Sequence, residues 1–277
     1  MGRRFRVRCA AVLTVALLAG CGSTAAPSAA GPSTTPSLTA PAGPSPAPAP
    51  MPSRRKTPVQ VAIFGDSQGT ALFATRPSTV ARSLRLSDES ISACGILRGQ
   101  VASRSGERFN LIGACPNWLP VWRDTAKRVK PDIALVVLGA WDVFNLKTKS
   151  KTTVFGTPEW DAAFLAQLRS GVTALRTSGA QVALAELPCY RPRKSNPRPP
   201  GWWPERGDDD RTHHVNDLLR QVTDGAHVFT VTPPAAFCDD KSIGDNRKYR
   251  YDGVHYLAPG AKLWFDAIIP QLLVLPS

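Results

Sequence analysis

Long apolar runs, closely spaced cysteines and acidic residues are all scarce in this sequence. After residue 20 no stretch is both long and apolar enough to span a bilayer, which excludes a protein with several membrane spans. No internal repeat and no nucleic-acid recognition motif is present. No two cysteines have the C-x-x-C spacing of a zinc knuckle. The sequence has 21 acidic and 34 basic residues, so its formal net charge is +13.

The first residues have the layout of a secretory signal. Residues 1–20 begin with an arginine-rich stretch, continue with an apolar run too short to remain in a bilayer, and end in small residues. The junction LAGC, Leu18–Cys21, resembles the lipobox of bacterial lipoproteins, in which the cysteine is lipidated and becomes the first residue. We therefore expect an exported protein anchored to the outer face of the cell membrane through Cys21. The alternative is an ordinary cleaved signal followed by a chance cysteine.

A compositional change marks the start of the folded part. Residues 21–57 are dominated by Pro, Ala, Ser and Thr, which offer little apolar surface to bury, so this segment is expected to be a disordered, extended tether. Residues 58–277, about 220 residues, are enough for one domain with a sizeable core.

The basic charge persists beyond the signal. Residues 1–20 hold four arginines and no acidic residue, so their removal lowers the net charge by four, to +9. A basic exported protein favours anionic wall polymers or lipid head groups as partners. Export argues against a nucleic-acid partner.

Four cysteines fall in the predicted domain and allow three disulfide pairings. An even number in an exported domain suggests two bridges, each contributing about 3–4 kcal/mol in the chain-entropy model. We favour Cys94–Cys115 with Cys189–Cys238, because each bridge would tie loops on one side of the domain. A metal site is the rival interpretation, and the cysteine spacing disfavours it.

Apolar runs alternate with helical patterns along the domain. Strands are predicted at residues 59–64, 91–96, 132–139, 180–187 and 227–232, the second of them as a short strand or strand end. Helices are predicted at residues 68–84, 159–179, 210–225 with Asp210 as N-cap, and 258–273, closed or interrupted near Pro270. Such alternation predicts an α/β three-layer sandwich, with a mostly parallel sheet of about five strands covered on both faces. Ligands of such sheets bind beyond the carboxyl ends of the strands.

Polar residues that could perform chemistry follow two of these strands and lie near the chain's end. Ser67, in FGDSQG, comes directly after the first strand, where Gly65 permits a sharp turn. Serine needs a base to act as a nucleophile. Of the four histidines, only His255, in RYDGVHY, lies in a predicted loop beside a carboxylate, Asp252. Asp252 can orient the imidazole and stabilise its charged form, so the pattern predicts that Ser67 and His255 meet in space.

These motifs together resemble the SGNH (GDSL-type) hydrolase superfamily. FGDS matches its first block and YDGVHY its last, which implies a flavodoxin-like fold and a triad of Ser67, Asp252 and His255. Cys94–Gly95 matches the block whose glycine N–H joins the Ser67 N–H in the oxyanion hole. GAWD (Gly139–Asp142) stands where the family has G-x-N-D, so Trp141 replaces the asparagine that normally donates to the oxyanion. Losing such a donor costs about 2.7–4 kcal/mol of transition-state stabilisation in an enzyme built around it. Either the Ser67 and Gly95 N–H groups suffice, or the Trp141 indole or another group substitutes, or activity is low.

A narrower resemblance concerns the segments CPNW, LGAWDV, LPCY and RYDGVHY. They are similar to the extracytoplasmic SGNH domains of membrane acyltransferases that acylate surface polysaccharides, in which tryptophan stands at the same position. This resemblance implies a serine esterase or O-acyltransferase acting on ester groups, O-acetyl above all, of cell-envelope glycans. It implies no cofactor and no metal, and makes an envelope acyltransferase a candidate partner.

Two other interpretations remain. GDSQG fits the G-x-S-x-G elbow of α/β-hydrolases, but there the serine normally follows several strands and the acid and histidine lie far apart. The Trp141 substitution also allows a catalytically weak or inactive module of the same fold that binds cell-wall polysaccharide.

Four further features have mainly structural interpretations. The loop 191–210 could bring Trp202 and Trp203 against a sugar and its arginines against an acidic polymer, although packed surface tryptophans are the simpler interpretation. Arg250 could steady the loop of His255, bind substrate or form a surface salt bridge. Asp66 and Asp142 are expected to shape the turns that carry them.

Overall fold

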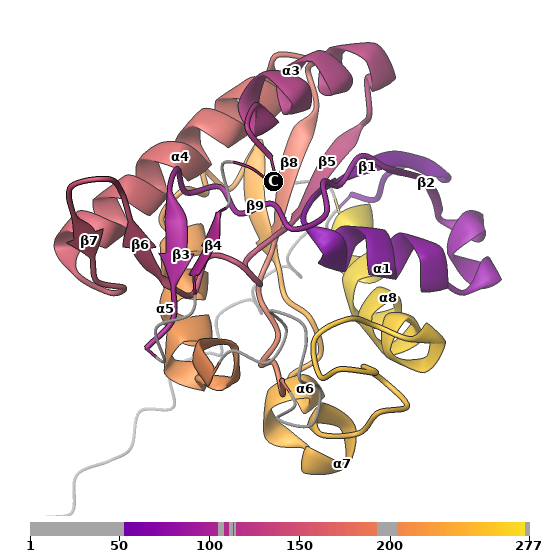
Figure 1. Ribbon diagram of the computed structural model, residues 1–277. Helices are drawn as coiled ribbons and strands as arrows, with labels where there is room; N and C mark the ends of the chain where they lie inside the picture. The colour runs from indigo at the N-terminus through magenta and orange to yellow at the C-terminus, as the bar shows by residue number, and fades with distance from the viewer. Residues whose placement is uncertain (1–52, 105–107, 111–112, 114, 193–203, 275–277) are drawn as a thin grey trace, which may run out of the picture. The chain divides into compact units, whose positions relative to one another are not determined.

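The five-stranded parallel sheet at the centre of the fold is formed by the continuous apolar runs of the sequence (Figure 1). The computed structural model describes residues 53–104, 108–110, 113, 115–192 and 204–274. All of them belong to one unit, Pro50–Ser277, and the second unit, Met1–Ala49, lies outside the described residues. The predicted signal, Cys21, and Trp202 and Trp203 also lie outside them.

The strand order is β2-β1-β5-β8-β9, and every neighbouring pair is parallel. The strands are β1 (Val59–Gly65), β2 (Leu84–Asp88), β5 (Ile133–Val137), β8 (Gln181–Ala185) and β9 (Val228–Val231). Every residue of β5 is buried, as expected for a strand covered on both faces. The carboxyl ends of β1 and β5 lie side by side, since Gly65 is in register with Val137.

Helices cover both faces of this sheet, and alternate residues of its strands divide between two cores. Ala62 and Phe64 point toward α3, α4 and α5, whereas Val61 and Ile63 point toward α1 and α8. The helices are α1 (Ser67–Thr75), α3 (Trp118–Val129), α4 (Pro158–Arg176), α5 (Asp209–Arg220) and α8 (Ala258–Leu273). The predicted α/β three-layer fold with five parallel strands is confirmed.

A small antiparallel sheet, which the sequence analysis did not predict, lies beside the main one. Its order is β4-β3-β6-β7, with β3 Gln100–Ala102, β4 Arg108–Asn110, β6 Asn145–Lys147 and β7 Thr152–Thr153. Strands of two or three residues are too short for a periodic signal. Four short helical segments also occur in the described residues: η1 Ser78–Arg82, η3 Pro204–Gly207, α6 Ala236–Asp239 and α7 Lys241–Gly244.

The second predicted strand is misplaced. The helix expected over residues 68–84 ends at Thr75, since Pro77 disfavours a helical conformation at Arg76, whose ψ is 139°. Leu84–Asp88 then forms β2 at the edge of the sheet, and residues 91–96 form a loop instead of a strand. Only Leu84 of β2 is fully buried, so the strand lacks the continuous apolar run that marked the others.

Three helix assignments also need correction. The N-cap of α5 is Asp208 rather than Asp210. Helix α8 continues through Pro270 to Leu273, because Leu272 and Leu273 are buried in the core and hold the last turn in place. Helix α3 has no counterpart among the predicted helices, although Trp118 and Trp122 contribute its buried face. Among the described helices, none combines the length and the apolar character needed to cross a bilayer.

The structure contains the two disulfides that the sequence analysis favoured. Cys94 is bonded to Cys115 and Cys189 to Cys238, with Cα–Cα distances of 5.4 and 4.8 Å. The first bridge fixes the loop before Gly95, and the second joins the segment after β8 to α6. Both bridges therefore constrain segments near the carboxyl edge of the main sheet.

Candidate active site

The turn after β1 gives Ser67 its position. Gly65 has φ +134°, and a Cβ there would lie 1.7 Å from the Val137 carbonyl oxygen, so only glycine fits beside β5. Asp66 caps α1, accepting a hydrogen bond from the Gln68 N–H at 2.8 Å. Ser67 is the first residue of the helix. Its side chain therefore lies at the strand ends, next to amides that lack partners within the helix.

Ser67, His255 and Asp252 form a continuous hydrogen-bonded chain. The Ser67 Oγ lies 2.7 Å from His255 Nε2, and His255 Nδ1 lies 2.7 Å from Asp252 Oδ2. Since an ionised carboxylate only accepts, Nδ1 carries the proton and Nε2 accepts from the serine hydroxyl. This arrangement can remove the hydroxyl proton when Ser67 attacks an electrophile.

The loop of Asp252 and His255 is fixed by its own backbone. Asp252 Oδ1 accepts hydrogen bonds from the N–H groups of Val254 and His255, at 2.9 and 2.7 Å. Burial opposes ionisation, but the hydrogen bonds from His255 and its charge hold the pKa of Asp252 below its ordinary value. The Asp252 and His255 side chains are 12% and 24% exposed, so a substrate can reach the imidazole while the carboxylate is largely shielded.

Two of the predicted oxyanion residues, Gly95 and Trp141, lie on segments that Asp142 connects. The Ile96 N–H, one residue after Gly95, donates to Asp142 Oδ1 at 3.0 Å. Asp142 itself follows β5 in a turn in which its N–H donates to the Gly139 carbonyl. Asp142 therefore ties the Gly95 loop to the turn that carries Trp141.

The Trp141 side chain is packed among rings and a cation. It is 5% exposed, it stacks on Phe109 with ring centroids 4.3 Å apart, and the Arg206 guanidinium lies 4.3 Å from its ring. Arg206 also donates to the Ala140 carbonyl oxygen. The position that holds asparagine in the SGNH pattern is thus a buried aromatic contact in this chain.

Residues 60–200, just over half of the chain, match a family described as a protein of unknown function, DUF459. The chain belongs to the DUF459 family. The matched region contains Ser67, Gly95 and Trp141 but ends before Asp252 and His255. No curated protein matches the chain.

Several solved structures share the fold of this DUF459 chain. A candidate acylhydrolase of Bacteroides fragilis aligns with a TM-score of 0.51 at 14% identity, covering 80% of this chain and 91% of that one. A GDSL-like lipase of Bacteroides thetaiotaomicron aligns at 0.47 and 15% identity, covering 77% and 86%. The periplasmic domain of a lipopolysaccharide acetyltransferase of Salmonella ser. Paratyphi A aligns at 0.47 and 13%, covering 79% and 85%. At these identities the likeness concerns the fold alone.

Two buried carboxyl groups lie behind the nucleophile of this DUF459 chain. Burial raises the pKa of Asp66 to about 6, opposed by its hydrogen bond from Gln68 and by the charges of His255 and Arg206. Burial, together with the charge of Asp66, raises the pKa of Asp142 to about 7. Both residues have the turn-shaping contacts expected from the sequence.

Arg206 is a site residue that sequence analysis missed. It is buried in η3, and this burial lowers its pKa to about 10, opposed by the charge of Asp66. The sequence analysis counted it only among the arginines of a long loop. No local pattern distinguishes it, because its place beside Trp141 and Asp66 depends on how that loop returns to the sheet.

Arg250 has a supporting position. It is 1% exposed and donates to the carbonyl oxygens of Cys189 and Gly244, at 2.8 and 3.2 Å. The interpretation of Arg250 as part of a surface salt bridge is therefore wrong. The residue instead joins the His255 loop to the Cys189–Cys238 bridge.

Within the part of the chain that the structure describes, one group of side chains consists of residue types that can bind a metal. Cys189, His213 and Cys238 have donor atoms within 4.8 Å of one another. The two sulfurs are bonded to each other, however, so neither is the thiolate that metals bind. The group belongs to the disulfide. The nucleophile-elbow alternative also does not fit, since Ser67 follows the first strand and Asp252 lies three residues before His255.

Proposed function

We propose that the chain is an SGNH-type serine esterase or O-acyltransferase that forms an acyl-serine intermediate. The observation that carries this proposal is the hydrogen-bonded chain from Ser67 Oγ through His255 to Asp252, with two contacts of 2.7 Å. Such a chain supplies a nucleophile, its base and an orienting acid, and it lies at the carboxyl ends of parallel strands, where α/β sheets bind their ligands.

The first half of the reaction forms the acyl-enzyme. His255 Nε2 takes the proton of Ser67 as its oxygen attacks the ester carbonyl, and Asp252 stabilises the imidazolium through Nδ1. The negative charge on the carbonyl oxygen is received by the N–H groups of Ser67 and Gly95. The ester's alcohol then leaves with the proton from His255, and the acyl group stays on Ser67.

The second half repeats these steps with a new nucleophile. Water or a sugar hydroxyl gives its proton to His255 and attacks the acyl-serine, and the proton returns to Ser67 Oγ when the product leaves. Hydrolysis and transfer therefore use the same residues and differ only in which hydroxyl reaches the acyl group.

The substrate and location belong to the same proposal. The acyl group is a small one, O-acetyl above all, on a cell-envelope glycan. Residues 1–20 are a signal peptide, Cys21 carries the lipid anchor, residues 21–57 are the tether, and residues 58–277 are the catalytic domain. An envelope acyltransferase is the candidate partner, since it would supply or consume acylated glycan. The lipobox and the SGNH motifs of the sequence support these assignments.

Hydrolysis of an aryl acetate tests the chemistry. Wild type is expected to release the aryl alcohol, and Ser67→Ala to lose on the order of 10³-fold or more in kcat. Equal rates in both proteins would contradict the mechanism. Hydrolysis and transfer are separated by adding an acylated donor with a glycan acceptor and measuring acylated product by mass spectrometry.

The packed Trp141 favours one second candidate, a binding module without catalysis. The contacts with Phe109 and Arg206 place an aromatic ring where the SGNH pattern has a polar donor. Labelling by a fluorophosphonate probe separates the two functions. Covalent labelling of Ser67 would contradict the binding module, and its absence in folded protein would favour it.

A further inference from the structure

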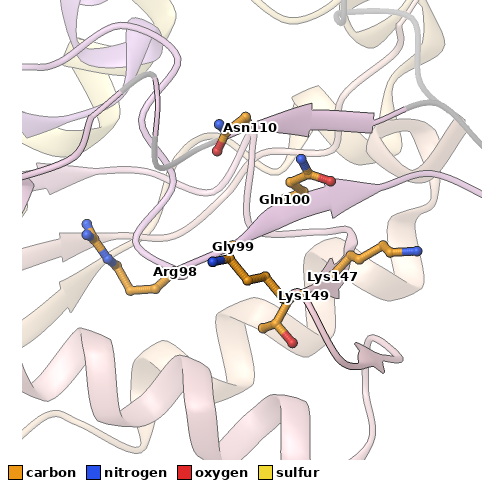
Figure 2. A pocket seen from close by; sticks show the side chains of 7 residues that line it. Arg98, Gly99, Gln100, Asn110, Lys147 and Lys149 are labelled. Atoms are coloured by element: carbon orange, nitrogen blue, oxygen red, sulfur yellow. The ribbon is translucent and has the colours of Figure 1, made fainter.

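A basic pocket lies on the small antiparallel sheet, outside the triad. Its volume is about 450 Å³, and it is lined by Arg98, Gly99, Gln100, Asn110, Lys147, Thr148 and Lys149. Figure 2 shows these side chains, with Arg98 and Lys147 on opposite sides of the view. Three of the lining residues are cationic and none is acidic or aromatic.

The strand register explains why these side chains gather. Gln100 of β3 is paired with Asn110 of β4 and with Lys147 of β6. Directly paired residues present their side chains on the same face, so these three form one polar row across the sheet. The next residue along, Val101, is paired with Phe109 and Leu146 on the opposite face, which packs against the core around Trp141. The pleat therefore holds the polar row away from the core.

The charges of the pocket are not neutralised by neighbours. Arg104 pairs with Glu205 and Asp208, and Lys151 pairs with Glu159. By contrast, Arg98, Lys147 and Lys149 form no ion pair with any residue that the structure describes. Arg98 and Lys149 are exposed and Lys147 is half-buried, so all three can reach a ligand. Three cations that form no ion pair with the described residues line this pocket, so its charge favours an anionic ligand.

Chain connectivity places this pocket close to the proposed oxyanion loop. Arg98 is three residues after Gly95, and an extended chain spans at most about 3.6 Å per residue, so their Cα atoms are within about 11 Å. On the other side, β6 begins three residues after Asp142, which is hydrogen-bonded to the same loop. A sugar unit in the pocket could thus belong to the polymer whose ester reaches Ser67.

We infer that this pocket binds an anionic group, carboxylate or phosphate, on the glycan whose ester is the substrate. The cations hold the anionic oxygens, and the amides of Gln100 and Asn110 hold neighbouring hydroxyls. Sites that bind single-stranded nucleic acid combine cationic side chains with aromatic side chains on which the bases stack. The lining of this pocket has no aromatic residue. The assignment of the ligand to the substrate rests on the proposed function.

Binding is measured with the Ser67→Ala variant of the full-length mature chain, so that turnover of the ligand does not affect the measurement. Calorimetry uses polygalacturonate, poly(glycerol phosphate), neutral dextran and single-stranded DNA as probes. Arg98→Gln/Lys147→Gln/Lys149→Gln is expected to weaken binding of an anionic glycan about tenfold. The matched control Arg85→Gln/Lys127→Gln/Arg169→Gln removes the same charge from exposed positions elsewhere. It should change the dissociation constant for the anionic glycan by less than about twofold.

Each outcome decides the inference. Preferential binding of polygalacturonate assigns the site to carboxylates, and preference for poly(glycerol phosphate) assigns it to phosphates. Three results would overturn the inference. They are equal weakening of binding by both triple variants, no binding of either anionic polymer, and tighter binding of DNA that depends on the pocket residues. Hydrolysis of neutral aryl acetate by the wild-type chain is measured separately. Absence of that hydrolysis would contradict the proposed function and leave the binding result intact.

Discussion

At the scale of single residues, Asp252 uses both carboxylate oxygens for different purposes. Oδ1 accepts from two backbone N–H groups of its loop, and Oδ2 accepts from His255 Nδ1. The first contacts fix the loop, and the last fixes the tautomer that leaves Nε2 free to accept a proton. Substituting this residue should therefore separate folding from catalysis.

We expect Asp252→Asn to fold and to lose activity. Its amide keeps an acceptor for the backbone but favours the wrong imidazole tautomer, so kcat for aryl acetate should fall on the order of 10³–10⁴-fold. Circular dichroism checks the fold and steady-state kinetics the rate. If kcat stayed within about tenfold of wild type, Asp252 would not orient the base.

The buried carboxyl group of Asp142 makes a second residue-scale prediction. Because burial raises its pKa to about 7, the folded protein binds its proton more tightly than the unfolded chain does. The stabilising contribution of this proton is fully present below the ordinary carboxyl pKa and is lost as the pH rises toward 7. The free energy of unfolding therefore falls over that range. Asp142→Asn keeps the oxygen that accepts from Ile96 and removes the titration.

The free energy of unfolding of Asp142→Asn relative to wild type should therefore increase between pH 4 and pH 7, by a few kcal/mol in order of magnitude. Urea denaturation at four pH values in this range measures it. A difference that does not change with pH would contradict the buried titration.

At the scale of elements, close backbone contacts position the loops. Gly253 has φ +83°, and a Cβ there would lie 1.6 Å from the Arg191 carbonyl oxygen. The Arg191 N–H in turn donates to the Gly253 carbonyl at 2.9 Å. The His255 loop is therefore held against the segment after β8 by contacts between main chains, which no side-chain movement can relax.

Gly253→Ala should displace this loop and lower activity as well as stability. Gly225 offers a matched control, since its φ is +73° and open space surrounds its Cβ position. Gly225→Ala should cost only about 1–2 kcal/mol, the strain of a left-handed residue, with kcat unchanged. Gly253→Ala should cost more and lower kcat at least about tenfold. Equal effects of the two substitutions on both measurements would show that the contact with Arg191 does not position the site.

At the scale of the whole molecule, the chain's first residues are proposed to decide its location. If Cys21 is lipidated, the full-length chain expressed in a bacterium should fractionate with membranes and incorporate labelled palmitate. Cys21→Ser should remove the label and release the domain, since a chain without acyl groups loses about 0.8 kcal/mol of membrane affinity per CH₂. Unchanged membrane association of the variant would contradict the anchor. Aryl acetate hydrolysis should be the same in both proteins.

Much of the main sheet could be predicted because its strands are covered on both faces. The continuous apolar runs of β1, β5 and β8 appear in the sequence as such, and their order along the chain suggested where Ser67 would lie. The edge strand β2 and the small sheet could not be located, because short or half-exposed strands carry no clear period. The basic pocket on the small sheet was missed for the same reason.

The sequence by itself determined the sheet's central strands, the turn that carries Ser67 and the pairing of Asp252 with His255, since each depends on residues close together along the chain. Only the tertiary structure decided that Ser67 and His255, 188 residues apart, lie 2.7 Å from each other. It also decided that Arg206 packs on Trp141 and that three cations line one pocket. Such contacts depend on how distant segments return to the sheet, and no local pattern encodes that return.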